Sequence, residues 1–334
     1  MTNRFSIPAL VAALFASPAF SATIRADPAI DCSTCAAWNG PHEPFKVYGS
    51  TYYVGVAGLS SILIASGDGL ILIDGGLPQS APAIAAHVEK LGFQVSDIRL
   101  ILNSHTHFDH AAGIAALQRA SGAEVAASAA SAKALESGGP MPNDPQYGLK
   151  GSRFPSVESV RVVGDGETLH VGPLAITAHY TPGHTPGGTT WTWQSCQDNV
   201  CEHMVYADSL NAVSGPSYRF SDEKAHPGVL GAFRKSIATV ADLPCDILLA
   251  PHPDMIDMEG KLARLREHSG TNPFVDSGPA RPTRHGPWPG WTSVWPKKTR
   301  SKAVGKDLIG CPKPVPAGKW REKLPLFRSP EIRR

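Results

Sequence analysis

Residues 105–110 read His-Thr-His-Phe-Asp-His, and this stretch decides how the rest of the chain is interpreted. Three imidazoles and one carboxylate occur within these six residues, directly after the apolar run 98–103, which predicts a short β-strand. Nitrogen and oxygen donors of these kinds suit a borderline cation such as zinc. A tight turn can direct alternate side chains toward two neighbouring positions. The stretch therefore predicts a metal centre at the end of a strand.

Two further histidines occur in comparable contexts. His184 lies in TPGHTPG at residues 181–187, and His252 lies in APHP at residues 250–253. Each follows a predicted strand, and prolines on both sides restrict the backbone and lower the entropy cost of holding a ligand loop. A lone histidine is usually a surface or core residue, but this set at strand ends is typical of a metal centre. The candidate metal ligands are His105, His107, Asp109, His110, His184 and His252.

The remainder of the chain alternates short β-rich runs with helical segments. Residues 45–73 contain four such runs separated by glycine turns, which predicts an antiparallel meander. More strands are expected between residues 159 and 207. Strands followed by helices, twice over, predict two β-sheets packed together with helices on the outer faces. Helices are expected at residues 82–91, 111–121, 129–136, 228–240 and 258–268.

Several motifs together resemble a known family. The 105–110 stretch, and Asp74 after its own strand, match the metallo-β-lactamase superfamily. Four more segments are similar to subclass B3 metallo-β-lactamases: PGHTPG at 182–187, YADSL at 206–210, LPCD at 243–246 and PHP at 251–253. The resemblance extends from about residue 31 to about residue 277. It implies an α/β fold, the four-layer αββα metallo-β-lactamase sandwich, with metals at one sheet edge.

The resemblance also implies a role for each candidate ligand. One zinc ion is expected on His105, His107 and His184. A second is expected on Asp109, His110 and His252, which makes two Zn²⁺ per chain. Ser209 takes the place where another subclass has a cysteine ligand, and this agrees with a second group made only of histidine and aspartate.

The activity implied by the resemblance is zinc-dependent hydrolysis of the β-lactam amide bond of penicillins, cephalosporins and carbapenems, which gives antibiotic resistance. A metal-bridged hydroxide would be the nucleophile, and Asp109 would help to orient it. Ser209 and Asn211 would face the carboxylate of the substrate, since an amide can donate hydrogen bonds as a hydroxyl does. Gln146 and Tyr147 lie on a loop that would overhang the pocket, although a plain packing role for this loop stays open.

Two other functions stay open. Other hydrolases of this fold, such as lactonases and thioesterases, carry the same first motif but use an aspartate that bridges both metals, and Asp208 could take that place. In the favoured interpretation Asp208 is instead a supporting carboxylate. The chain could also be a non-catalytic zinc-binding relative. Nucleic acid is not expected as a partner, because the chain contains no recognisable binding module.

The N-terminus indicates export. Arg4 precedes an apolar run at residues 7–15, and small residues at 19 and 21 suit a signal peptidase. We expect residues 1–21 to be a signal peptide and the mature chain to be a periplasmic or secreted monomer without a membrane anchor. Cysteines of an exported chain are expected to form disulfides. We predict a Cys196–Cys201 pair across a hairpin tip and a Cys32–Cys35 pair.

The C-terminal part differs in character from the rest. After residue 280 there are 14 Lys and Arg against 3 Asp and Glu, a net charge of +11, while the whole chain carries +2. We therefore divide the chain into a metallo-β-lactamase domain at residues 22–278 and an atypical basic, Pro- and Trp-rich tail at residues 279–334. We interpret the tail as the product of a shifted reading frame and expect it to be poorly ordered, with a genuine extension as the alternative. The family normally ends in a helix whose cysteine pairs with the one matching Cys245, so Cys245 is expected to lack this partner, while a pairing of Cys245 with Cys311 stays open.

Overall fold

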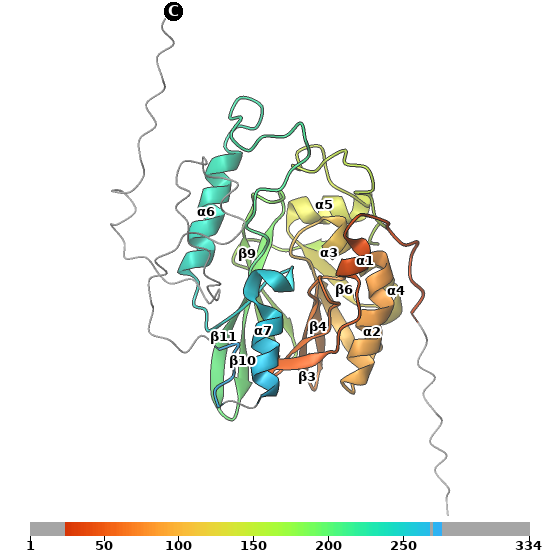
Figure 1. The fold of residues 1–334 in the computed structure, drawn as a ribbon, viewed down its shortest axis with the longest axis vertical. Coiled ribbons are helices and arrows are strands. Elements are labelled where there is room, and N and C mark those ends of the chain that lie inside the picture. Colours follow the sequence, from red (N-terminus) through yellow and green to blue (C-terminus); the bar gives the residue numbers. More distant parts are fainter. Residues whose placement is uncertain (1–23, 268–269, 276–334) are drawn as a thin grey trace, which may run out of the picture.

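Two β-sheets packed face to face form the centre of the molecule, and helices cover the outer face of each sheet (Figure 1). The structure is a computed structural model that describes residues 24–267 and 270–275. In Figure 1, helices α2 and α4 lie beyond the first sheet, and helix α6 lies beyond the second. The predicted α/β sandwich with outer helices is confirmed.

The first sheet has seven strands in the order β1-β2-β3-β4-β5-β6-β7. Strands β1 to β4 pair in antiparallel fashion and form the expected meander. Strands β4 to β7 pair in parallel, so their carboxyl ends meet at one edge of the sheet. The strands are β1 (Phe45–Tyr48), β2 (Thr51–Tyr53), β3 (Ile62–Ser66), β4 (Gly69–Ile73), β5 (Ile98–Leu102), β6 (Glu124–Ala127) and β7 (Val160–Val162).

The second sheet has five strands in the order β12-β11-β10-β9-β8. All neighbours are antiparallel except β11 and β12, which run parallel. Strand β8 was not among the expected strands, although its buried side chains alternate with exposed ones. The strands are β8 (Thr168–Val171), β9 (Leu174–Tyr180), β10 (Thr189–Gln197), β11 (Val200–Tyr206) and β12 (Ile247–Leu249).

The helix expected at residues 111–121 begins only at Ile114, because the Gly113 N–H donates to the carbonyl oxygen of Gly76 at 3.0 Å and not to a preceding helical turn. A Cβ atom at Gly113 would lie 2.1 Å from the carbonyl oxygen of Gly75, so only glycine allows the chain after β4 to approach this closely. A separate helical turn, α3, precedes this break, in the segment that carries four of the candidate ligands. The helices are α1 (Cys35–Trp38), α2 (Ala81–Lys90), α3 (Phe108–Ala111), α4 (Ile114–Ser121), α5 (Ala129–Ser137), α6 (Val229–Asp242) and α7 (Met258–Arg266), with short 3₁₀ turns at η1 (Pro78–Ser80), η2 (Val95–Asp97) and η3 (Pro253–Ile256).

Two apolar cores hold these layers together. The first lies between the sheets and contains fully buried side chains such as Ile71 and Trp191. The second lies between the first sheet and helices α2, α4 and α5, with Leu72 and Leu117 among its members. Full burial of one such side chain contributes about 1.5–3 kcal/mol to folding. Strand ends anchored in this way are a rigid base for the loops that follow them.

Both predicted disulfides are confirmed. Cys196 and Cys201 face each other near the tip of the β10–β11 hairpin, with their Cα atoms 4.0 Å apart, and Cys32 pairs with Cys35. Cys245 is also disulfide-bonded, so the expectation that it lacks a partner is wrong. That expectation came from the absence of the cysteine with which the family normally forms this bond. A disulfide depends only on the distance and direction between two cysteines, so another cysteine can take its place.

The expected signal peptide at residues 1–21 and the tail at residues 279–334 lie outside the described residues. Within the described part of the chain, every helix is too short or too polar to cross a bilayer.

Candidate metal centre

The candidate ligands gather at one edge of the sandwich, where strands of both sheets end. Strand β5 leads into the segment that carries four of them, and the last two of these four lie in the short helix α3. His184 follows β9, and His252 follows β12. The sheets thus bring together residues that are up to 147 positions apart in the chain.

The six side chains form two groups of three. In each group, one ligand atom from every residue lies within 4.8 Å of the others. The groups adjoin, because the ring centroids of His105 and His110 are only 4.4 Å apart. This is the grouping that the family resemblance implies, while the role of each residue as a ligand stays a prediction. The groups are His105, His107 and His184, and Asp109, His110 and His252.

Every histidine of the first group already uses one ring nitrogen in a hydrogen bond to an oxygen atom. A neutral imidazole has a single N–H, so this nitrogen donates and the other nitrogen carries a lone pair. The three hydrogen bonds join His105 Nδ1 to Asp208 Oδ1 (2.8 Å), His107 Nε2 to Asp144 Oδ1 (3.1 Å) and His184 Nδ1 to the carbonyl oxygen of Asn211 (2.9 Å).

The remaining ring nitrogens of the first group face one another, and each carries a lone pair when the other nitrogen of its ring donates. His107 Nδ1 lies 3.0 Å from His184 Nε2, and His105 Nε2 is buried with no hydrogen-bond partner. Burial holds the pKa of both His105 and His184 well below the ordinary value, which keeps these two rings neutral. Lone pairs at this distance repel unless a cation lies among them. The donor set therefore fits a metal ion.

The second group combines two imidazoles with a carboxylate. Asp109 Oδ2 lies 3.3 Å from His110 Nε2 and 3.4 Å from His252 Nε2. Burial alone would raise the pKa of Asp109, but the imidazoles of His110 and His252 more than offset it and hold that pKa well below its usual range. The other ring nitrogen of His252 donates to the carbonyl oxygen of Gly58 at 3.1 Å. An ionised oxygen donor beside two nitrogens also fits a metal ion.

The charge balance of the region agrees with a bound cation. Four aspartates are buried there: Asp74, Asp109, Asp144 and Asp208. Among the described residues, none of these carboxylates forms an ion pair with a lysine or arginine. Burial raises the pKa of Asp74 and raises that of Asp208 well above its ordinary value. A buried negative charge without a positive partner costs several kcal/mol, which a divalent cation would offset.

Asp74 belongs to neither group and instead connects the two sheets. Its backbone φ of 61° is in the left-handed region, which aspartate tolerates better than most residues. Its carboxylate accepts hydrogen bonds from the Ser104 N–H (2.8 Å), the Ser104 hydroxyl (2.7 Å), the Tyr206 hydroxyl (2.8 Å) and the Asn103 amide (3.1 Å). These bonds join the ends of β4, β5 and β11 directly beneath His105.

Helix α6 braces the loop that carries His184. A Cβ atom at Gly183 would lie 2.1 Å from the ring of Phe233, so this ring packs directly on the loop backbone. The Ser236 hydroxyl donates to the carbonyl oxygen of Pro182 at 2.7 Å. The helix therefore limits the movement of His184.

The expected substrate-binding residues lie on two loops of this region. The Ser209 hydroxyl and the Asn211 side-chain oxygen are buried with no hydrogen-bond partner in the structure, and the Asn211 backbone contacts His184. Gln146 is half-buried, and Tyr147 is 55 % exposed. The two loops meet where the Gly215 N–H donates to the carbonyl oxygen of Pro145 at 2.9 Å.

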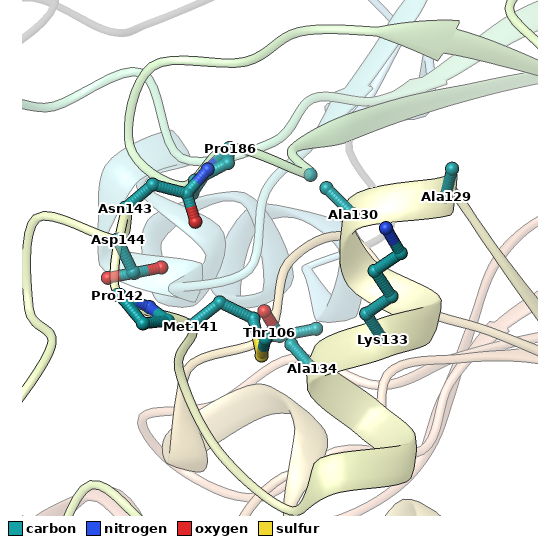
Figure 2. A pocket seen from close by; sticks show the side chains of 11 residues that line it. Thr106, Ala129, Ala130, Lys133, Ala134, Met141, Pro142, Asn143, Asp144 and Pro186 are labelled. Carbon is teal, nitrogen blue, oxygen red and sulfur yellow. The ribbon is translucent and has the colours of Figure 1, made fainter.

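Sequence reasoning missed three of the groups that orient the histidines. Asp144 lies in a loop rich in Gly, Pro and Asn, whose composition indicates a loop but does not mark a buried acid. The carbonyl oxygens of Gly58 and Asn211 leave no side-chain signal at all. A cavity of about 510 Å³ lies beside this loop, between residues 141–144 and helix α5, and Asp144 is part of its lining (Figure 2).

Comparisons with known proteins agree with the fold. The family profile described as Metallo-beta-lactamase superfamily matches residues 54–197. The solved structure of Rm3 metallo-beta-lactamase is 50% identical, with a TM-score of 0.71, over 74% of this chain and 91% of that chain. MEM-A1, a subclass B3 metallo-beta-lactamase isolated from a soil metagenome library, is 55% identical, with a TM-score of 0.69, over 72% of this chain and 90% of that chain.

Curated relatives match over a shorter stretch. A hydroxyacylglutathione hydrolase of Anaeromyxobacter dehalogenans is 33% identical over 133 residues, which is 40% of this chain and 41% of that protein. The chain spans less than half the length of the curated relatives that it matches first.

Proposed function

The chain belongs to the metallo-β-lactamase superfamily, and on this premise we propose that it is a zinc-dependent hydrolase of the β-lactam amide bond. Its substrates in this proposal are penicillins, cephalosporins and carbapenems. Two solved β-lactamases that are 50% and 55% identical to it, over about nine tenths of their own lengths, support this activity. Imidazole and carboxylate donors support zinc as the metal, with one ion in each group of three ligands.

The position of Asp208 is the observation that carries this proposal. An aspartate that bridges two metals must direct its oxygens between the two groups of ligands. Asp208 Oδ1 instead lies 2.8 Å from Nδ1 of His105, on the side of the ring opposite the nitrogen that is left for the metal. Asp208 is also absent from both groups of candidate ligands. An Asp208 that holds the ring of His105, and does not bridge two metals, is expected of a β-lactamase and not of the thioesterases and lactonases.

The chemistry divides between the metal and the chain. Bound zinc supplies Lewis acidity, which polarises an amide carbonyl and makes water acidic enough to react near neutral pH. The ionised Asp109 carboxylate accepts a hydrogen bond, so it can orient the O–H of an attacking water. Asp208 and the carbonyl oxygen of Asn211 hold the rings of His105 and His184 in place. Burial of the ligands excludes most competing water from the reacting atoms.

Recognition of the substrate is assigned to the loop after β11. A β-lactam antibiotic carries a carboxylate next to its ring, and an unpaired hydroxyl and an amide are suitable hydrogen-bond donors for it. Ser209 and Asn211 supply these two groups, and both have side-chain oxygens that lack a partner in the protein. A buried polar atom without a partner costs about 1–3 kcal/mol, which a bound carboxylate would recover at Ser209.

Hydrolysis of a hydroxyacylglutathione thioester is the second candidate function. The observation that favours it is the 33% identity to a hydroxyacylglutathione hydrolase over 133 residues. This match covers less of the chain than the matches to the solved β-lactamases do, and it does not account for the position of Asp208.

One preparation separates these functions. The purified chain is loaded with zinc and assayed with nitrocefin, with a carbapenem and with a hydroxyacylglutathione thioester. We expect hydrolysis of both β-lactams, loss of activity with a chelator, and little thioester hydrolysis. Preferential hydrolysis of the thioester would favour the second candidate. Zinc binding without hydrolysis of any substrate would indicate a non-catalytic relative.

We also propose that the protein is exported and acts as a monomer in the periplasm or outside the cell. Two disulfides among the described residues support an oxidising compartment. N-terminal sequencing of the protein from a periplasmic fraction tests the export, with Ala22 as the expected first residue. Light scattering of the purified protein tests the oligomeric state.

A further inference from the structure

Asp144 forms a hydrogen bond with the candidate ligand His107, and the proposed reaction gives Asp144 no role. It is 3% exposed and lies on the loop of residues 141–152, between α5 and β7. Its Oδ1 atom accepts a hydrogen bond from Nε2 of His107 at 3.1 Å. The same oxygen accepts a second hydrogen bond from the backbone N–H of Gln146 at 2.8 Å. One carboxylate oxygen thus joins the ring of His107 to the backbone of the loop.

The partners of the other histidines show why this contact matters. His184 and His252 donate to backbone carbonyl oxygens, which are fixed by the loops around them. His105 donates to Asp208, which directly follows β11. Asp144, the partner of His107, instead lies on a long loop and does not follow a strand end. The orientation of His107 therefore depends on the position of that loop, and the position of the loop depends on His107.

The loop has little behind it to hold it in place. The cavity of about 510 Å³ lies between residues 141–144 and helix α5, and its lining includes Ala130, Lys133 and Ala134 on the helix side. Figure 2 shows Asn143 and Asp144 on one side of this cavity and the α5 side chains on the other. Because empty volume replaces apolar packing here, polar contacts hold the loop. Those that join it to other parts of the chain include the hydrogen bond of Asp144 with His107, the bond from Gly215 N–H to the Pro145 carbonyl, and the contact of the Ser137 hydroxyl with Met141 Sδ.

We propose that Asp144 is a positioning residue that sets the tautomer of His107 and fastens the 141–152 loop to the metal centre. Its carboxylate accepts a hydrogen bond from the Nε2–H of His107, which leaves the Nδ1 lone pair free for the metal. Through the Gln146 N–H it also places Gln146 and Tyr147, which follow Pro145 in the same loop, at the edge of the site. This inference rests on the proposed metal role of His107. Partners of this kind typically change metal affinity by about 10–100-fold when they are removed.

Asp144→Ala and the isosteric Asp144→Asn test the proposal against a matched control, Asp165→Asn. Asp165 is an exposed loop aspartate whose Oδ1 also accepts a backbone N–H, from Tyr180 at 2.8 Å, but it has no contact with the ligands. Zinc affinity is measured by competition with a chromophoric chelator. We expect Asp144→Ala to lower the affinity of one zinc about 10–100-fold, Asp144→Asn to lower it less, and Asp165→Asn to leave it unchanged.

Two further measurements separate positioning from general stability. The visible spectrum of the cobalt-substituted protein should change in the Asp144 variants and not in Asp165→Asn, because it reports the geometry of the ligands. Trypsin cleavage after Lys150, within the loop, should be faster in the metal-free Asp144 variants than in the metal-free wild type. If Asp144→Ala does not fold, the same comparison is made with Asp144→Asn.

The outcomes distinguish this inference from the proposed function. A wild-type chain that binds no zinc would overturn the proposed function itself. A wild-type chain that binds zinc, with both Asp144 variants matching it in affinity, cobalt spectrum and loop cleavage, would overturn only the positioning role of Asp144.

Discussion

Nδ1 of His105 lies 2.8 Å from Oδ1 of Asp208, and the opposite nitrogen of the ring, Nε2, is buried without a hydrogen-bond partner in the protein. Both side chains are almost fully buried, so the contact is shielded from water. The pair comes from the two different sheets, since His105 follows β5 and Asp208 follows β11. The geometry of the first group of candidate ligands therefore depends on how the sheets pack.

Replacement of Asp208 tests this relationship. We expect Asp208→Ala to lower the affinity of one zinc about 10–100-fold while the second group still binds metal. Competition with a chromophoric chelator measures both affinities. Asp97→Asn, at the opposite end of β5, is the control and should have no effect. Loss of both zinc ions in Asp208→Ala would point to a bridging aspartate and to the thioesterase alternative.

Removal of the metal should abolish hydrolysis, and added zinc should restore it. We expect about two zinc ions per chain by elemental analysis. His184→Ala should lose about one of them, because it removes a donor from the first group only. His170→Ala, at an exposed position on β8, is the control and should keep both. Full activity after exhaustive chelation would exclude the proposed mechanism.

Asp74 should be one of the most sensitive positions for stability. Asp74→Ala leaves the buried donors of Ser104 and Tyr206 without an acceptor, so we expect a loss of about 3 kcal/mol in the free energy of unfolding. Asp74→Asn should lose less, because the amide oxygen still accepts and asparagine also tolerates the left-handed backbone. Urea unfolding of the metal-free proteins gives both values. Equal losses in the two variants would contradict this explanation.

The Cys196–Cys201 disulfide should matter for stability and not for activity. The double variant Cys196→Ser, Cys201→Ser should lose about 2 kcal/mol, since the closed loop is short. Its kcat should be unchanged, because the hairpin tip lies at the far end of strand β11 from Asp208, roughly 20 Å away. Urea unfolding and a nitrocefin assay measure the two effects. A large fall in kcat would show that the hairpin tip does influence the metal centre.

His179 should give the protein a measurable dependence of stability on pH. Burial lowers the pKa of His179, so this ring binds a proton less readily in the folded chain than in the unfolded chain, where the pKa is about 6.5. Its contribution to stability is therefore complete above that value and is lost as the pH falls below it. His179→Gln removes this dependence while a donor can remain for the Thr192 hydroxyl.

The measurement is the difference in unfolding free energy between the wild type and His179→Gln at pH 8 and at pH 5.5. The wild type should lose more than the variant at the lower pH. The opposite sign would mean that the folded state favours the charged ring.

Local features of the amino-acid sequence were sufficient for the fold class and for the identity of the candidate ligands. Four of the ligands lie within residues 105–110, so their proximity follows from chain connectivity and a single strand end. The Cys196–Cys201 pair could be predicted for the same reason, because a hairpin turn brings its two ends together. Local patterns also predicted the antiparallel meander, since its strands are neighbours in the chain.

Only the tertiary structure decided which groups orient the ligands. His107 and Asp144 are 37 residues apart, His105 and Asp208 are 103 apart, and His252 and Gly58 are 194 apart. Such pairs depend on how segments that are distant in the chain meet, and this leaves no periodicity in the sequence. The break at Gly113 has the same origin, because it results from close approach to Gly75 and not from local helix propensity. Connectivity therefore accounts for the proximity of four of the six candidate ligands, and packing between distant segments determined which ring nitrogens are left without an oxygen partner in the protein.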